Sequence, residues 1–229
     1  MTSDFEPDLS ILQDAQKHLW GELINVPNSF VLYGGTAIAL RLGHRFSIDF
    51  DLFRSEGFDP DKLYETISFL SQSTVIQKAA DTLTCLVDRG GPVQVSFFGL
   101  SCLKQIQPPC LAPDNHLQVA SLIDLAGMKS AVVQKRAEAK DYLDIDAILS
   151  QSNIDLPQAL AAGKFIYGSS FNPQNTLKAL SYYEDGNLKT LAQDVKDRLA
   201  RAVKAVDLDH LPELDHHRIP PQHNRGFQR

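Results

Sequence analysis

The apolar residues of the first half of the chain follow two different spacings. Leu9, Leu12, Leu19 and Leu23 recur near the helical period, which predicts an amphipathic helix over residues 8–25. Elsewhere, short runs with strand-like alternation are separated by turns that contain glycine or proline, including a hairpin turn at 89–92. The other elements that this half predicts are strands over 29–33, 47–53, 83–88 and 93–98 and helices over 36–42 and 60–72.

The pattern becomes wholly helical after a proline-rich, irregular stretch over 103–116. Ser121 and Asp124 form the Ser-x-x-acid pattern of a capping box, which predicts a long helix from this point to about Ala139. Further helices are expected over 141–151, 156–167, 173–184 and 188–206. The sequence therefore predicts an α+β fold, in which a mixed β-sheet with flanking helices is followed by an all-helical C-terminal half.

This change of pattern predicts three segments along the chain. We expect an α/β domain over residues 1–118 and a helical domain over 119–206. The remaining segment, 207–229, holds four of the seven histidines and three prolines and is expected to be a loosely ordered tail.

Composition narrows the class of protein only modestly. The net charge of −6 disfavours a protein that coats nucleic acid non-specifically, so any nucleic-acid contact would need a local basic patch. No apolar stretch approaches the length of a membrane span, and the N-terminus lacks the features of a secretory signal. The three cysteines form no CxxC pair. We therefore expect a cytoplasmic protein with no membrane partner.

Two carboxylates are the first candidates for chemistry. On a strand over 47–53, alternation places Asp49 and Asp51 on one face together with Ser47, about 7 Å apart at their backbones. Two like charges this close repel each other, and a divalent cation relieves the repulsion. Oxygen ligands suit Mg²⁺, which also keeps substrate phosphates as ligands. Asp49 and Asp51 are therefore candidate metal ligands.

A glycine turn before this strand is the second candidate. Gly34, Gly35 and Thr36 follow a short apolar run and begin a predicted helix. Glycines let backbone N–H groups approach a phosphate closely, and the start of the helix adds a favourable dipole. A pair of aspartates or a pair of glycines alone is common on a solvated surface or in an ordinary turn. Their combination in this order favours a metal and nucleotide site.

The same residues resemble a known family. Gly35-Thr36, a gap of twelve residues and then Asp49-x-Asp51 resemble the hallmark of the nucleotidyltransferase superfamily that includes DNA polymerase β. The longer run through Gly43-His44-Arg45 resembles the AbiEii/AbiGii family of bacterial abortive-infection toxins. The similarity continues in the strings Asp124-Leu125-Ala126-x-Met128-Lys129, Arg136 and Lys140-Asp141-Tyr142-x-Asp144.

This resemblance implies a nucleotidyltransferase fold and activity. It implies Mg²⁺ or Mn²⁺ at Asp49 and Asp51, an NTP seated by the glycine turn, Ser47 and Arg136, and catalytic roles for Lys129 and Asp141. It also implies a toxin that modifies an acceptor hydroxyl, with RNA such as a tRNA 3′ end as a candidate, and a cognate antitoxin.

The roles of the basic and acidic residues in the helical half stay open. Lys129 and Arg136 are seven residues apart, so on one long helix they would share a face. Asp141 acts as a general base, forms a salt bridge with Lys129 or Arg136, or is a simple acid at a helix N-terminus. His44 and Arg45 either contact phosphates or are surface loop residues.

One feature departs from the superfamily pattern. A third carboxylate is usual on a neighbouring strand, but the polar face of the strand over 93–98 carries Gln94 and Ser96 instead. The alternatives to an RNA-modifying toxin are therefore a catalytically silent nucleotide-binding protein and a transferase that modifies a small molecule of the antibiotic type.

Overall fold

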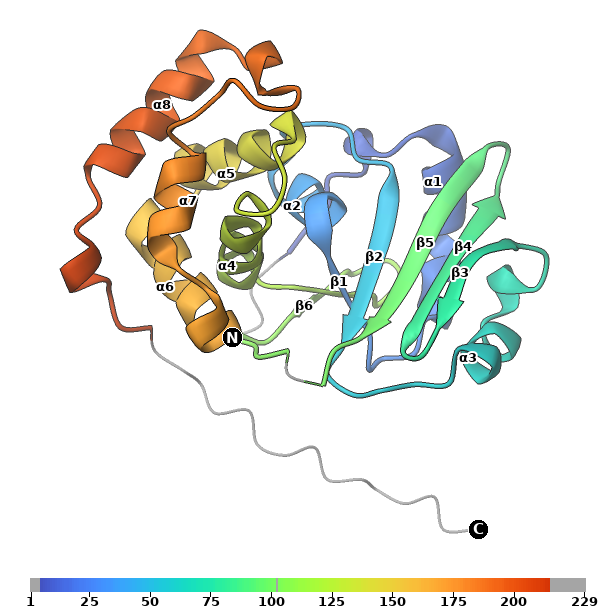
Figure 1. Cartoon of the computed structure of the whole chain (residues 1–229). Coiled ribbons are helices and arrows are strands. Elements are labelled where there is room, and N and C mark those ends of the chain that lie inside the picture. Colours follow the sequence, from blue (N-terminus) through green and yellow to red (C-terminus); the bar gives the residue numbers. More distant parts are fainter. Residues whose placement is uncertain (1–4, 102, 215–229) are drawn as a thin grey trace.

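The first half of the molecule is built around one seven-stranded sheet, and the second half is helical (Figure 1). The computed structural model describes residues 5–101 and 103–214. The strands lie in the order β3-β4-β5-β2-β1-β7-β6. The predicted α+β fold class is confirmed. The strands are β1 (Val31–Tyr33), β2 (Asp49–Arg54), β3 (Thr74–Ala79), β4 (Thr82–Asp88), β5 (Pro92–Gly99), β6 (Cys110–Leu111) and β7 (Gln118–Val119).

The two faces of the sheet differ in composition, and only one of them is wholly apolar at the central strands. Phe50 and Leu52 of β2 and Phe97 of β5 are fully buried on the first face, where the ring of Trp20 from α1 (Asp14–Trp20) lies 6.2 Å from that of Phe50. The alternate residues of β2 include Asp51, so the other face carries the candidate metal ligands. Burial of the aromatic and aliphatic face fixes the register, because a shift by one residue would bury the carboxylates.

The predicted helix forms, but the glycine turn is its first turn, so it begins two residues earlier than expected. α2 (Gly34–Leu42) begins directly after β1 and ends at Gly43, whose φ of 62° is the left-handed conformation usual after a helix. The predicted hairpin between β4 and β5 is confirmed by their antiparallel pairing. The predicted helix start is confirmed, since the Ser121 hydroxyl accepts a hydrogen bond from the backbone N–H of Asp124. The capping box is only half formed, because the Asp124 carboxylate accepts from the backbone N–H groups of Ile106 and Gln107 instead.

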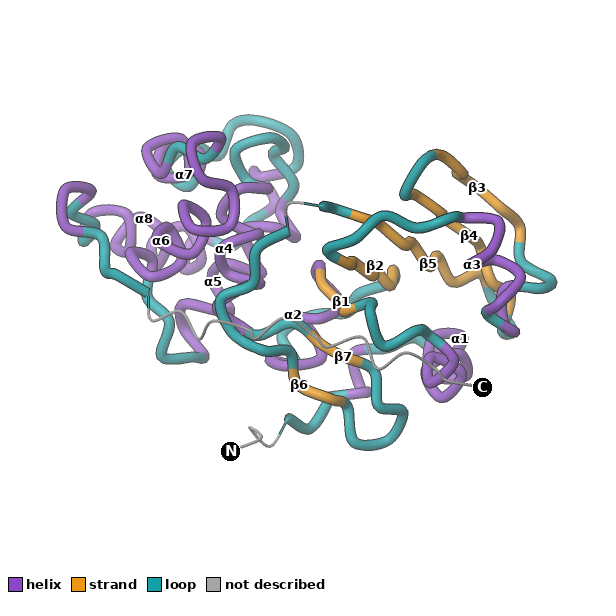
Figure 2. The backbone as a smooth tube through the Cα atoms, turned by 90° about the horizontal axis from the view of Figure 1, so that it is seen from below, coloured by secondary structure: helices purple, strands orange, loops and turns teal. Residues whose placement is uncertain are grey.

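In the described part of the second half, five α-helices gather beside the sheet, on the side away from β3 and β4 (Figure 2). The first two, α4 and α5, pack against α2, so the glycine turn lies where the two halves meet. Among the described residues, no helix is both long and apolar enough to cross a membrane. The helices are α4 (Leu122–Val132), α5 (Ala139–Gln151), α6 (Leu156–Tyr167), α7 (Pro173–Ala179) and α8 (Gln193–Lys204).

Several element boundaries differ from the predictions. The helix expected over 8–25 is α1 flanked by 3₁₀ turns at Leu9–Ile11 and Gly21–Asn25, and α3 (Pro60–Thr66) ends early. The helix expected to reach Ala139 ends at Val132, and α7 and α8 are shorter than expected. β3 was not predicted because all six of its residues are exposed on the edge of the sheet, which leaves no buried face to produce alternation.

The short strands β6 and β7 lie in and just after the stretch expected to be irregular. β7 pairs with β1 and includes residue 118, where the sequence places a domain boundary; that boundary stays a prediction. Of the expected tail, residues 207–214 are described and hold a 3₁₀ turn at Leu208–His210, and the rest lies outside the described residues.

Candidate functional site

The carboxylate pair lies directly beside the glycine turn. Asp51 of β2 pairs with Tyr33, the last residue of β1. Gly34 comes directly after Tyr33 and begins α2. Gly34 has a φ of +75°, and a Cβ atom at this position would lie only 2.8 Å from Asp51 Oδ2. Only glycine therefore lets the start of α2 approach the carboxylate this closely.

The position of the expected third carboxylate is now defined by the strand register. Asp49 lies opposite Gln94 and Asp51 lies opposite Ser96 on the parallel strand β5. Ser96 is buried, and its Oγ lies 3.3 Å from that of Thr84. Within the described part of the chain, no group of three or more histidine, cysteine or acidic residues is placed to hold a metal ion. The site therefore offers two carboxylates from β2, with neutral side chains beside them.

Both carboxylates are held in an environment that disfavours their charge. Burial raises the pKa of Asp49. Burial and the neighbouring charge of Asp49 together raise the pKa of Asp51. Neither carboxylate makes a hydrogen bond or ion pair with a residue that the structure describes. Two adjacent carboxylates without a direct partner are the donor set that a divalent oxygen-seeking cation fits.

Thr36 and Ser47 connect the turn to the start of the carboxylate strand. The Thr36 hydroxyl donates to the backbone carbonyl of Asp49, and its Oγ1 lies 2.7 Å from Ser47 Oγ. Ser47 precedes β2, so it lies outside the strand rather than on its face as expected. Both hydroxyls are buried and serve to hold the glycine turn against the carboxylate strand.

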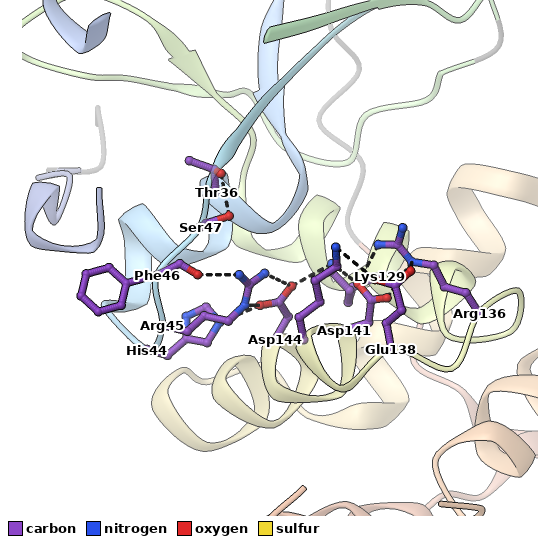
Figure 3. A network of polar contacts seen from close by, with 11 residues as sticks. Thr36, His44, Arg45, Phe46, Ser47, Lys129, Arg136, Glu138, Asp141 and Asp144 are labelled. Atoms are coloured by element: carbon purple, nitrogen blue, oxygen red, sulfur yellow. Dashed lines mark hydrogen bonds and ion pairs between the residues drawn. The ribbon is translucent and has the colours of Figure 1, made fainter. Parts of the chain in front are cut away.

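A buried ion network lies below this turn and comes mostly from the helical half (Figure 3). Lys129 Nζ of α4 lies 2.9 Å from Asp141 Oδ1 and 2.8 Å from Asp144 Oδ2, both on α5. The side chains of the two aspartates are 0% exposed and that of Lys129 is 8% exposed. Charges this deeply buried are stable only when they are paired.

His44 and Arg45 join the first half to this network. His44 Nε2 lies 2.7 Å from Asp144 Oδ1, and Arg45 donates from Nε to Oδ1 and from Nη2 to Oδ2 at 2.6 and 2.9 Å. A Cβ atom on Gly35 would overlap Arg45 Nη2, so the guanidinium lies directly against the glycine turn. The alternative in which both are surface loop residues is therefore wrong.

Arg136 joins the network from the segment between α4 and α5. The sequence predicted that Arg136 shares a helix face with Lys129, but this is wrong because α4 ends at Val132. Instead the two cations converge on Asp141, to which Arg136 donates from Nε at 2.7 Å and from Nη2 at 3.1 Å. The Arg136 side chain is 47% exposed, so this part of the network is in contact with solvent.

The cations decide the charge state of the two buried aspartates. Burial alone would raise the pKa of Asp141 and of Asp144. For Asp141, hydrogen bonds from Arg136 and the charge of Lys129 outweigh burial and hold the pKa below its ordinary value. For Asp144, His44, Lys129 and Arg45 lower the pKa in the same way. Both carboxylates are therefore ionised near neutral pH.

Sequence reasoning missed the structural centre of this network. The sequence assigns Asp144 no role of its own, yet its carboxylate contacts the side chains of His44, Arg45 and Lys129. The sequence signal that could have indicated its role is the pair of adjacent basic residues, His44 and Arg45, directly before a buried strand. Such residues need acidic partners, and the i,i+3 aspartates of a helix can provide them.

We expect Gly34→Ala to lower the free energy of unfolding by about 2 kcal/mol, because alanine adopts a positive φ poorly and its methyl group would push Asp51 aside. Urea denaturation measures the effect. The matched control is Gly21→Ala, where φ is −64° and no atom lies within 4 Å of the added Cβ. Equal stabilities of the two variants would contradict the proposed constraint.

Known proteins are similar to this one over most of the chain. The family described as "Nucleotidyl transferase AbiEii toxin, Type IV TA system" matches residues 22–222. The uncharacterized protein aq_aa25 of Aquifex aeolicus (strain VF5) is 29% identical over 189 residues, which are 79% of this chain and 89% of that protein.

Two solved structures share the fold. MenT4, the nucleotidyltransferase toxin Rv2826c of Mycobacterium tuberculosis H37Rv, superposes with a TM-score of 0.58 at 17% identity, covering 85% of this chain and 83% of that one. An H. pylori protein superposes with a TM-score of 0.53 at 14% identity, covering 82% and 91%. Because the family match spans most of the sequence, the chain belongs to the AbiEii nucleotidyl transferase toxin family of type IV toxin–antitoxin systems.

Proposed function

We propose that this protein transfers a nucleoside monophosphate from an NTP to a hydroxyl of RNA, such as a tRNA 3′ end, with release of pyrophosphate. The observation that carries the proposal is a pair of carboxylates with raised pKa, Asp49 and Asp51, beside a helix start that only glycine can form. Family membership supports an NTP substrate and a cognate antitoxin. We place the reaction in the bacterial cytoplasm.

The two carboxylates would hold Mg²⁺ or Mn²⁺, which would neutralise phosphate charge and polarise the reacting phosphoryl group when bound. The first backbone N–H groups of α2, from Gly34 to Thr36, have no partner within the helix and would bind the triphosphate. The hydroxyls of Thr36 and Ser47 hold this turn against the start of β2. The charges of Lys129 and Arg136 act on Asp51 and would favour a bound polyphosphate near it.

We assign Asp141 a positioning role rather than that of a general base. Its two oxygens accept three hydrogen bonds from Lys129 and Arg136, and these cations keep its pKa low. A carboxylate in this state is a poor proton acceptor, because a general base works best with a pKa near the working pH. Asp141 therefore holds the two cations in place for the substrate.

The proposal is tested by incubating the protein with each labelled NTP, Mg²⁺ and total RNA. We expect label to enter RNA, with loss of the signal on chelation of the metal and its recovery when Mg²⁺ or Mn²⁺ is restored. Asp49→Ala should be inactive, whereas Lys62→Ala, an exposed residue of α3, should label as the wild type does. Undiminished labelling by Asp49→Ala would refute the assignment.

The neutral residue opposite Asp51 supports a second candidate, a catalytically silent nucleotide-binding protein of the same fold. Ser96 stands where a third carboxylate is usual, and it is buried against Thr84. This candidate predicts that calorimetry detects NTP binding while no acceptor yields pyrophosphate. Pyrophosphate release that depends on RNA would exclude it.

A further inference from the structure

A cavity of about 460 Å³ opens beside the ion network, in the helical half of the molecule. It lies between the segment that joins α4 to α5 and the segment that includes α7 and the residues after it. Its lining includes Lys135, Arg136, Tyr142, Asn175, Lys178 and Tyr182. None of these side chains except Arg136 belongs to the site described above.

The cavity offers an exposed aromatic ring. The Tyr182 side chain is 53% exposed although it is large and apolar, whereas Tyr142 is buried and donates its hydroxyl to the Ala179 carbonyl. Asn175, on the same wall, has an exposed amide. An exposed aromatic ring can stack on a nucleobase, and an amide beside it can hydrogen-bond to the edge of that base.

The lining is basic, in contrast to the whole chain. Lys135, Arg136 and Lys178 face one carboxylate in the lining, that of Asp185. Lys135 and Lys178 are exposed, and neither forms an ion pair with a residue that the structure describes. In a protein of net charge −6, two unpaired lysines around an aromatic cavity form the local basic patch that a nucleic-acid ligand requires.

Arg136 connects the cavity to the carboxylate pair. It lines the cavity and is bound to Asp141 through Nε and Nη2. It also interacts electrostatically with Asp51. A strand of nucleic acid whose end reaches Asp51 can therefore place a neighbouring nucleotide in the cavity.

We propose that this cavity binds the single-stranded end of the acceptor RNA, with a base stacked on Tyr182 and backbone phosphates bound by Lys135 and Lys178. The inference rests on the proposed function and adds the location of its acceptor. A polynucleotide fits better than the NTP because the glycine turn and Lys129 already serve the triphosphate. With the triphosphate bound at the glycine turn, Lys135 and Lys178 are left for the backbone phosphates of a longer strand.

The test measures binding of a short, fluorescently labelled single-stranded RNA by anisotropy at several salt concentrations, and binding of NTP by calorimetry. Tyr182→Ala is expected to weaken RNA binding about tenfold, and Tyr182→Phe, which keeps the ring, should bind as the wild type does. Lys178→Ala should reduce the slope of log Kd against log salt concentration by about 1. NTP affinity should be unchanged in all three variants, which alter exposed side chains.

The matched control is Lys62→Ala, an equally exposed lysine of α3 far from the cavity lining, which should leave RNA binding unchanged. Wild-type RNA affinity in Tyr182→Ala and Lys178→Ala would overturn the inference and leave the proposed function intact. Weaker NTP binding with unchanged RNA binding would also overturn it, because the cavity would then hold the NTP. If the wild-type protein neither binds nor labels RNA, the proposed acceptor itself is wrong.

Discussion

Asp51→Asn is expected to abolish nucleotide transfer and, at the same time, to make the protein more stable. Asparagine keeps the shape of the side chain but removes the negative charge that the cation requires. Loss of this ligand should lower the rate of transfer by a factor on the order of 10³. The labelling assay with RNA and Mg²⁺ measures this loss.

The gain in stability follows from the raised pKa of Asp51, which burial and Asp49 cause. A carboxyl group whose pKa is higher in the folded protein favours folding below its unfolded pKa. That contribution is lost as pH rises through the folded pKa. At neutral pH the ionised group therefore costs stability, and asparagine should add about 1 kcal/mol, or about 3 °C in Tm.

Calorimetry in the absence of metal measures this second effect. Glu65→Gln, an exposed residue of α3, is the control for charge removal alone and should leave Tm unchanged. The gain from Asp51→Asn should shrink as pH falls, since the wild-type carboxyl group then becomes neutral as well. A lower Tm for Asp51→Asn at neutral pH would contradict the conclusion that the ionised Asp51 destabilises the folded protein.

Asp144→Asn is expected to have the largest effect on folding. It removes the carboxylate that pairs with Lys129, Arg45 and His44, and Asp141 can compensate only Lys129. Breaking a buried pair leaves uncompensated charge in the interior, so the free energy of unfolding should fall by about 3–5 kcal/mol. Urea denaturation measures the change.

The control for Asp144→Asn is Asp61→Asn, which removes an ion pair of similar length. Asp61 Oδ1 lies 2.6 Å from Lys78 Nζ, but both side chains are exposed, so the expected loss is below about 1 kcal/mol. Similar losses in the two variants would show that burial of the network contributes nothing.

The pH dependence of unfolding should also differ between the wild type and Asp144→Asn. Because the folded pKa of Asp144 is lowered, its contribution to stability is present above the unfolded pKa and is lost as pH falls through the folded pKa. The wild type should therefore lose stability steeply below about pH 4. Asp144→Asn should show a shallower loss, which denaturation at a series of pH values measures.

The local parts of the site could be predicted from the sequence. Alternation on a strand places Asp49 and Asp51 on one face, and the glycines before a helix indicate the turn, because both features depend on neighbouring residues. The contact of Gly34 with Asp51 follows from pairing between adjacent strands.

The remaining parts of the site depend on contacts between distant residues. His44 and Arg45 meet an aspartate 100 and 99 positions later, and no local pattern specifies that partner. The length of α4 was overestimated because the residues after Val132 have good helical propensity, while the turn that brings Arg136 to Asp141 is a tertiary arrangement. β3 gave no signal because it has no buried face.

The long separation between Arg45 and Asp144 also affects when the protein can first become active. While the chain is being synthesised, the glycine turn and β2 leave the ribosome well before α5. Until α5 emerges and folds against α2, the nascent chain has the carboxylate pair but neither Lys129 nor Arg136 held in place beside it. We therefore expect a ribosome-bound toxin to be inactive until most of its chain has been made.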